Sequence, residues 1–131
     1  MGGHEGKEHG FDRLFEAVEY FPEKVPGMIN SEPELLNCEN YSGETVLQFF
    51  SMEGEEKIIE LLLSCGAVAD EWAVYFACGP AHVGTINLLL GAGARPDCDA
   101  CASQLRFWEV PRKKKIEIKR IFYNHGYEIK I

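Results

Sequence analysis

Two segments of the chain share one pattern of apolar and small residues. Residues 60–70 read ELLLSCGAVAD and residues 87–97 read NLLLGAGARPD, so each contains three leucines, a Gly-Ala pair and a closing aspartate at the same spacing. Gly66 and Gly93 lie 27 positions apart, and a further step of 33 positions leads to Gly126. Turn residues that recur at such intervals predict an array of stacked structural units.

Each unit is predicted to contain two short helices. In the clearest unit, apolar residues crowd two segments, 46–50 and 58–63, and Gly54 separates them. Gly66 follows the second segment, at a position where a helix needs a left-handed C-cap residue. A helix that is apolar on several faces must be covered from more than one side, and stacking against neighbouring units provides that cover.

Helix–turn–helix units that end in LLL-x-x-G-A resemble ankyrin repeats. The resemblance covers about residues 11–126 and is strongest at 43–70 and 85–97. It implies an all-α fold, an ankyrin-repeat solenoid of helix–turn–helix pairs with short finger loops. The implied organisation is a flexible tail at 1–10 and a single domain at 11–131, with repeats at about 11–42, 43–70, 71–98 and 99–131. A tetratricopeptide array, the alternative, has a Trp, Tyr and Pro signature on a period of about 34 residues.

The sequence also departs from the ankyrin pattern. The Thr-Pro-Leu-His turn of that family is TVLQ at residues 45–48 and WAVY at residues 72–75. The shorter spacing of 27 removes residues next to Asp70, where a finger hairpin is expected, so the third finger is predicted to be a tight turn. Pro26-Gly27 predicts a late or kinked second helix in the first unit, because proline is tolerated only near a helix start.

The composition fits one globular domain. The chain has 131 residues, of which 46% are hydrophobic, enough for one continuous core. No apolar run approaches the ~20 residues that cross a bilayer. The polar start of the chain lacks a secretory signal, so we expect a cytoplasmic protein whose five cysteines are thiols.

Charge is distributed unevenly along the chain. Residues 1–70 contain 15 acidic and 4 basic residues, a net charge of −11, whereas residues 71–131 contain 6 acidic and 9 basic residues, a net charge of +3. An acidic half repels nucleic acid and attracts a basic partner by long-range steering. We therefore expect a basic protein as partner, no binding to nucleic acid or membranes, and a monomer in the free state.

Two short motifs are candidates for chemistry, and each has a simpler structural interpretation. Cys98 and Cys101 form a single C-x-x-C pair, whereas a structural zinc site needs four ligands, so Cys101 is interpreted as an ordinary finger residue. The basic run RKKK at 112–115 resembles an import signal or a phosphate contact, but a terminal repeat also needs a polar end face. No histidine has triad-like partners, so we expect no enzyme, no metal and no cofactor.

Without a catalytic set, function is expected at the surface. Resemblance to ankyrin arrays implies a concave face made of the fingers and the outward side of each first helix. Trp, Tyr and Arg are the residues most often found as interface hot spots, and several of them fall in this region. The predicted partner-binding residues are Tyr41, Ser42, Glu44, Met52, Glu53, Glu71, Trp72, Tyr75, Gln104, Trp108 and Arg112.

Three functions are compatible with these observations. The favoured one is a small stoichiometric inhibitor, such as an immunity protein or antitoxin, that blocks a partner through the concave face. The first alternative is an adaptor of the viral or eukaryotic ankyrin kind, with residues 112–115 as a second surface. The second alternative is an accessory subunit that uses Cys98 and Cys101 to help a metal centre.

Overall fold

The computed structural model describes residues 2–131, with side chains from His9 onward, and the described chain is all-helical. The all-α class predicted from the sequence is confirmed. An isolated bridge between Glu39 and Thr45 is the one strand-like pairing in the described residues. The helices are α1 (Gly2–Tyr20), the 3-10 helix η1 (Pro22–Lys24), α2 (Val25–Ser31), the 3-10 helix η2 (Pro33–Asn37), α3 (Val46–Glu53), α4 (Glu56–Ser64), α5 (Glu71–Cys78), α6 (Val83–Gly91), α7 (Cys98–Phe107) and α8 (Arg112–Asn124).

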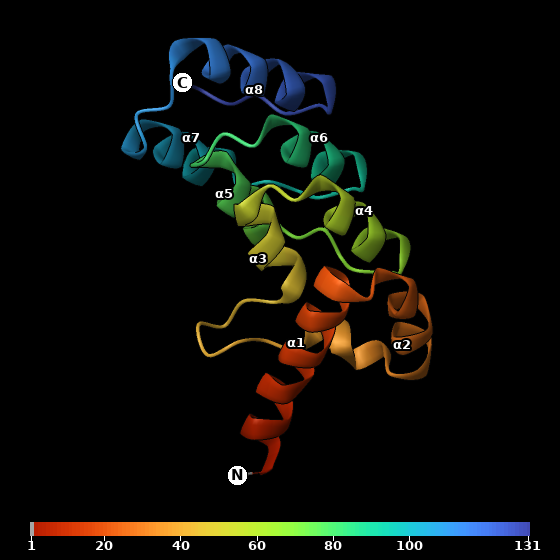
Figure 1. Cartoon of the computed structure of the whole chain (residues 1–131). Helices are drawn as coiled ribbons and strands as arrows, with labels where there is room; N and C mark the ends of the chain where they lie inside the picture. Colours follow the sequence, from red (N-terminus) through yellow and green to blue (C-terminus); the bar gives the residue numbers. More distant parts are fainter. Residues whose placement is uncertain (1) are drawn as a thin grey trace.

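The helices from α3 onward form two layers (Figure 1). In the first layer α5 packs between α3 and α7, and in the second layer α6 packs between α4 and α8. Consecutive helices also contact each other across short turns, as α3 does with α4 and α5 with α6. Helix α1 extends the first layer by packing against α3. The helices in the middle of the stack are thus covered on several sides, as their apolar sequences require.

The last three helices of the second layer end in the same backbone motif. Gly66, Gly93 and Gly126 follow α4, α6 and α8 with φ angles of +101°, +97° and +91°. The residue after each glycine donates its backbone N–H to the carbonyl five positions earlier, at 3.0, 3.1 and 2.9 Å. This pair of features is a Schellman motif, which satisfies carbonyls that the helix end leaves free. The C-cap predicted at Gly66 is confirmed.

Side-chain caps start the helices of the first layer. Thr45 and Gln48 form a reciprocal capping box at the start of α3. Asp70 and Asp97 each accept the backbone N–H three positions later, at 2.9 and 3.0 Å, and so start α5 and α7. Gln48 also donates its Nε2 proton to the second oxygen of Asp70 at 2.8 Å. One amide side chain therefore caps its own helix and holds the start of the next helix in the layer.

Only one connection in the described chain forms a hairpin, at 39–45. Residues 67–70 lead straight into α5, as the 27-residue spacing predicts, but residues 94–97 lead equally directly into α7. The fourth finger predicted around Cys101 is wrong, because Cys101 lies inside α7, and the predicted repeat boundary after residue 98 falls one residue inside this helix. The last helix pair is longer than the pair before it because its helices are longer: α7 and α8 have 10 and 13 residues, whereas α5 and α6 have 8 and 9.

The first pair of helices is irregular. Pro26 lies in the first turn of α2, which follows the short helix η1, so the late start predicted from Pro26-Gly27 is confirmed. Arg13 donates N–H groups from both of its terminal guanidinium nitrogens to the Glu32 carboxylate, at 3.0 and 2.8 Å, and this hydrogen bonding holds the pKa of the Glu32 carboxyl below its ordinary value. Helix α1 begins at Gly2 and so includes residues 2–10, which the sequence predicts to be a flexible tail. Met1 lies outside the described residues.

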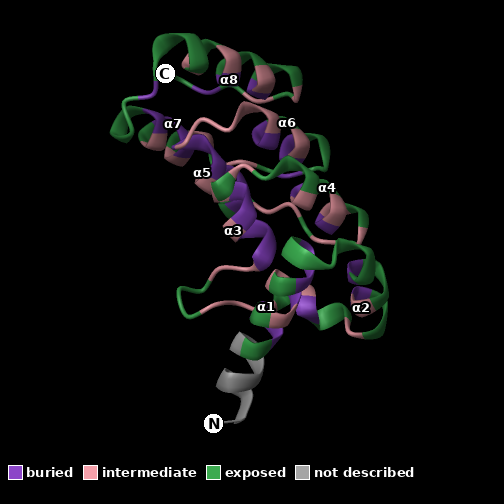
Figure 2. Cartoon of the chain, in the orientation of Figure 1, coloured by how far each residue is buried: buried purple, intermediate pink, exposed green. Residues whose placement is uncertain are grey.

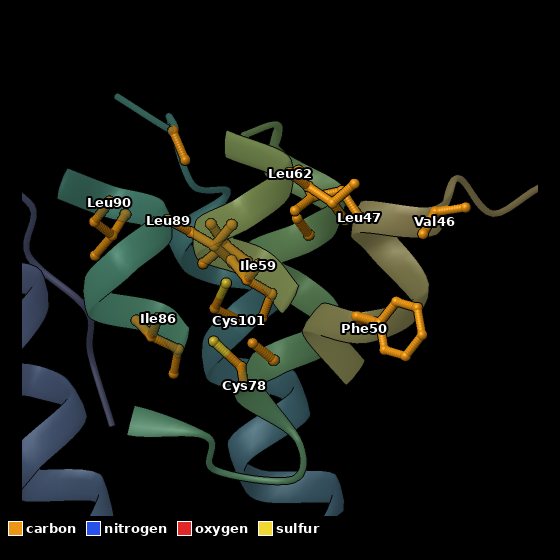
Figure 3. Packing of buried hydrophobic residues seen from close by; sticks show 14 of the residues in the cluster. Val46, Leu47, Phe50, Ile59, Leu62, Cys78, Ile86, Leu89, Leu90 and Cys101 are labelled. Atoms are coloured by element: carbon orange, nitrogen blue, oxygen red, sulfur yellow. The ribbon is translucent and has the colours of Figure 1, made fainter. Parts of the chain in front are cut away.

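The core is one continuous cluster between the two layers (Figure 2). Ile59 and Leu62 of α4 are fully buried, and so are Ile86 and Leu89 of α6 at the matching positions. Figure 3 shows these side chains gathered with those of α3 and α5. Within the described part of the chain, no helix has both the length and the apolar character that crossing a membrane requires.

We expect Leu62→Ala and Leu89→Ala each to lower the free energy of unfolding by ~2–5 kcal/mol, because each leaves a cavity between stacked helices. Chemical denaturation measures this loss. Val68→Ala is the control, since Val68 is 77% exposed, and it should change stability by less than ~0.5 kcal/mol. Leucine variants as stable as the Val68 control would contradict the packing described above.

Candidate binding surface

Helix α5 carries three aromatic side chains in mutual contact. The ring centroids of Trp72 and Tyr75 lie 5.8 Å apart in an edge-on arrangement, and those of Tyr75 and Phe76 lie 5.7 Å apart. Trp72 is 54% exposed, whereas Tyr75 and Phe76 are partly buried. Edge-to-face packing holds such rings in place, so the group presents a stable aromatic surface.

The positions of these rings follow from how α5 is anchored. One face of α5 is fixed against the core by four fully buried residues, Ala73, Val74, Ala77 and Cys78. Because a helix turns about 100° per residue, the aromatic residues between them must face outward. The WAVY segment at 72–75 corresponds by sequence to the Thr-Pro-Leu-His turn of the ankyrin pattern, and Trp72 lies in the first turn of α5, where it is half exposed.

A groove lies between α5 and α7 and is lined by two of the three aromatic residues, Trp72 and Tyr75. It has a volume of about 240 Å³ and is lined by Glu71, Trp72, Tyr75, Asp97 and Ala100. The methyl side chain of Ala100 leaves open the space that a larger residue of α7 would fill. The groove therefore offers an aromatic wall that a partner side chain can reach.

The charge around the groove is acidic. Its lining contains Glu71 and Asp97 and no Lys or Arg. Asp97 uses one oxygen to accept the Ala100 N–H at 3.0 Å, and the exposed Asp99 follows on the same turn of α7. An aromatic wall beside carboxylates favours a cationic side chain, which gains from both the ring face and the negative charge. The groove is suited to binding Arg or Lys of a partner.

The structure brings together only part of the predicted set. Glu71, Trp72 and Tyr75 share the α5–α7 groove. The predicted set lacks Phe76, Asp97 and Ala100. Asp97 did have a signal in the sequence, because it is the aspartate that closes the second of the two Leu-Leu-Leu segments. Phe76 directly follows Tyr75, but its contacts with Trp72 and Tyr75 depend on the helical geometry of α5.

Three predicted residues lie apart from the groove, in the hairpin. Tyr41 and Ser42 are exposed at its tip, with Tyr41 at 89% exposure. Asn40 shapes the turn: its side-chain oxygen accepts the N–H groups of Ser42 and Glu44, each at 3.0 Å, and its amide donates to the Glu44 carboxylate. This loop is well defined, but none of its residues lines the groove of α5.

The remaining predicted residues lie at the carboxyl ends of the first-layer helices, except for Arg112, which lies at the start of the second-layer helix α8. Met52 and Glu53 end α3, and the Met52 carbonyl oxygen is 2.9 Å from Nε2 of His82, which explains His82 as a structural residue. Trp108 caps the end of α7, where its Nε1 donates to Gln104 Oε1 at 3.1 Å, and Arg112 begins α8. These residues and the groove residues therefore belong to different parts of the surface.

Trp108 contacts the previous helix pair through a glycine. A Cβ added to Gly79, just after α5, would lie only 2.6 Å from Nε1 of Trp108. The indole therefore packs directly on the backbone at Gly79, and 54% of Trp108 stays exposed. Trp108 is a packing contact between neighbouring pairs as well as a surface residue.

The cysteines of the C-x-x-C pair do not share one environment. Cys101 is fully buried in α7, and the Sγ atoms of Cys78 and Cys101 face each other in the core (Figure 3). A hydrogen bond with Cys101 and burial raise the pKa of the Cys78 thiol far above its ordinary value, and burial raises the pKa of Cys98. Metal ligation uses the thiolate, so these shifts oppose it. The described residues contain no group of three or more His, Cys, Asp or Glu side chains arranged to hold a metal ion.

No protein-family model matches the chain, and no curated protein matches it either. Its function is therefore inferred from the surface itself.

We expect Cys101→Ser to lower the free energy of unfolding by ~1–3 kcal/mol, because it buries a hydroxyl in an apolar site. Cys65→Ser is the matched control at a partly exposed position and should cost less than ~0.5 kcal/mol. Thermal and chemical unfolding both report the difference. Equal stabilities for the two variants would restore the interpretation of Cys101 as a surface residue.

Proposed function

We propose that this chain is an ankyrin-type repeat protein that binds another protein and has no catalytic activity of its own. Three features support the repeat assignment: stacked helix pairs, two layers, and Gly-Ala helix ends 27 positions apart at Gly66 and Gly93. Such arrays work by presenting one continuous surface. The loss of two of the three inter-pair hairpins leaves the first-layer helices as the accessible part of that surface.

The α5–α7 groove is the observation that carries the proposal. Trp72 is a large side chain, 54% exposed, in a hollow whose walls combine an aromatic ring with carboxylates. Exposed tryptophan and tyrosine in a pocket are the usual anchors of protein interfaces. The net charge of −11 on residues 1–70 adds long-range attraction for a basic partner. We infer that the partner places an Arg or Lys side chain in the groove.

The proposed role is that of a small stoichiometric inhibitor in the cytoplasm, monomeric when free. A specific interface covers about 800 Å² of each partner, which a stack of this size can supply from one side. One bound chain would then cover the active or contact surface of a basic protein, as immunity proteins and antitoxins do.

The role is tested by comparing two baits. The wild-type chain and the Trp72→Ala variant are immobilised separately, and proteins from the source cells that only the wild type retains are identified by mass spectrometry. A single basic partner whose activity falls to zero at one equivalent of the chain supports inhibition. A partner that keeps its activity while a second protein is captured with it would replace inhibition by bridging.

Charge and anchor residues should affect different steps of binding to that partner. Glu71→Lys should mainly slow association and weaken its salt dependence, because a rim charge acts through steering. Trp72→Ala should speed dissociation and cost ~2 kcal/mol or more in binding free energy, as a central anchor does. Surface plasmon resonance at two salt concentrations separates the two rates.

Two matched control variants change residues outside the groove, one on the second layer and one at Trp108. Glu60→Lys makes the same charge change as Glu71→Lys on the exposed side of α4, and Trp108→Ala removes the second tryptophan. Both should retain the wild-type rates within about threefold, since neither residue lines the groove. A larger loss from Glu60→Lys than from Glu71→Lys would place the partner on the second layer.

A further inference from the structure

Helix α8 ends the second layer and leaves one face uncovered (Figure 1). It packs against α6 through the buried residues Ile118 and Phe122. Away from this buried face, Arg112, Ile116, Lys119 and Tyr123 are all exposed, with Ile116 at 48% and Tyr123 at 77%. Their spacing of four, three and four positions is that of residues facing a neighbouring helix.

The basic residues of α8 have no acidic partners in the described part of the chain. No ion pair there involves any of them, whereas Arg13 does pair with Glu32. Within α8 the only acidic residue is Glu117. The basic residues of the helix are Arg112, Lys113, Lys114, Lys115, Lys119 and Arg120.

The uncovered face is also hollowed. One hollow of about 470 Å³ is lined by Arg112, Lys115, Ile116, Lys119 and Ile131. A second, of about 680 Å³, is lined by Lys119, Tyr123, Asn124, Gly126, Tyr127 and Glu128. Lys119 lines both hollows, and we call the two together the α8 groove.

We propose that the α8 groove binds an acidic amphipathic helix of another protein. Ile116 and Tyr123 would contact apolar side chains that lie one or two turns apart on the partner helix. Carboxylates beside those side chains would pair with Arg112, Lys115 and Lys119. The stretch from residue 112 to residue 123 spans roughly 16 Å, the length of three helical turns. This second surface does not depend on the function proposed for the α5–α7 groove, whose acidic rim selects partners of the opposite charge.

The arrangement favours a helix over other anionic partners. Binding to the phosphates of a nucleic acid would use the basic residues alone and would give the apolar side chains between them no partner. The net charge of −11 on residues 1–70 also repels a nucleic acid. A second copy of the chain could offer that acidic half, and a membrane could offer anionic headgroups. The experiment below assigns a distinct result to each of these.

The probe is a synthetic helix of ~14 residues, about four turns, with Leu at the four-three-four spacing and Glu at the flanking positions. It carries a fluorophore and blocked ends, and binding to the whole chain is followed by fluorescence anisotropy. A peptide of the same composition in scrambled order is the first control. The proposal requires the ordered peptide to bind at least about tenfold more tightly than the scrambled one, since both carry the same charge.

Two charge-matched variants locate the site. Lys115→Glu with Lys119→Glu should weaken binding by about tenfold or more, because both residues line the α8 groove. Lys113→Glu with Arg120→Glu changes the net charge equally but off the groove, and should weaken binding by less than about threefold. Ile116→Ser should weaken binding without any change in net charge. Circular dichroism checks that each variant folds, and Trp72→Ala should bind the peptide like the wild type.

Several results would overturn the proposal. Equal losses from the two charge variants, or equal binding of the scrambled peptide, would mean attraction by net charge alone. Tighter binding to a duplex RNA or to vesicles of phosphatidylserine, with the same dependence on Lys115 and Lys119, would assign the groove to that class of partner. A concentration-dependent rise in mass on sedimentation, abolished by Lys115→Glu with Lys119→Glu, would assign it to a second copy of the chain.

Discussion

Burial of short apolar helices against their neighbours is the constraint on which this structure depends. Helices α3 to α7 have only 8 to 10 residues, too few to be stable in water alone. Each is stable because the next pair covers it, and Ile59, Leu62, Ile86 and Leu89 are fully buried between the layers. Capping side chains add to this: Gln48 holds Asp70 in the orientation that starts α5.

The same packing decides what the surface offers. With Ala73 and Val74 fixed against the core, Trp72 and Tyr75 have no room inside and form an exposed aromatic wall. The direct entry of the chain into α5 and α7, without finger hairpins, leaves that wall open and brings Asp97 next to it. The placement of aromatic rings beside carboxylates thus arises from two short connections.

The two ends of the stack differ in charge, and this difference gives the molecule two distinct surfaces. The first 70 residues are strongly acidic, whereas α8 carries six basic residues and one acidic residue. Helix α8 must also close the core, so it buries Ile118 and Phe122 on one side and keeps its cations in solvent. Ile116 and Tyr123 are not needed for that closure, yet they line the exposed side between the cations.

The sequence by itself determined the all-helical class and the ends of α4, α6 and α8, because these features are local. Gly66, Gly93 and Gly126 mark the left-handed residues that end helices, and the spacing of apolar residues marks the buried faces. Only the tertiary structure decided that Cys101 faces Cys78 and that Asp97 lies beside Trp72, pairs more than twenty positions apart. A connection can form a finger hairpin or lead directly into the next helix, and this choice changes all the contacts that later residues make. That choice depends on the packing of whole pairs, which no short pattern records.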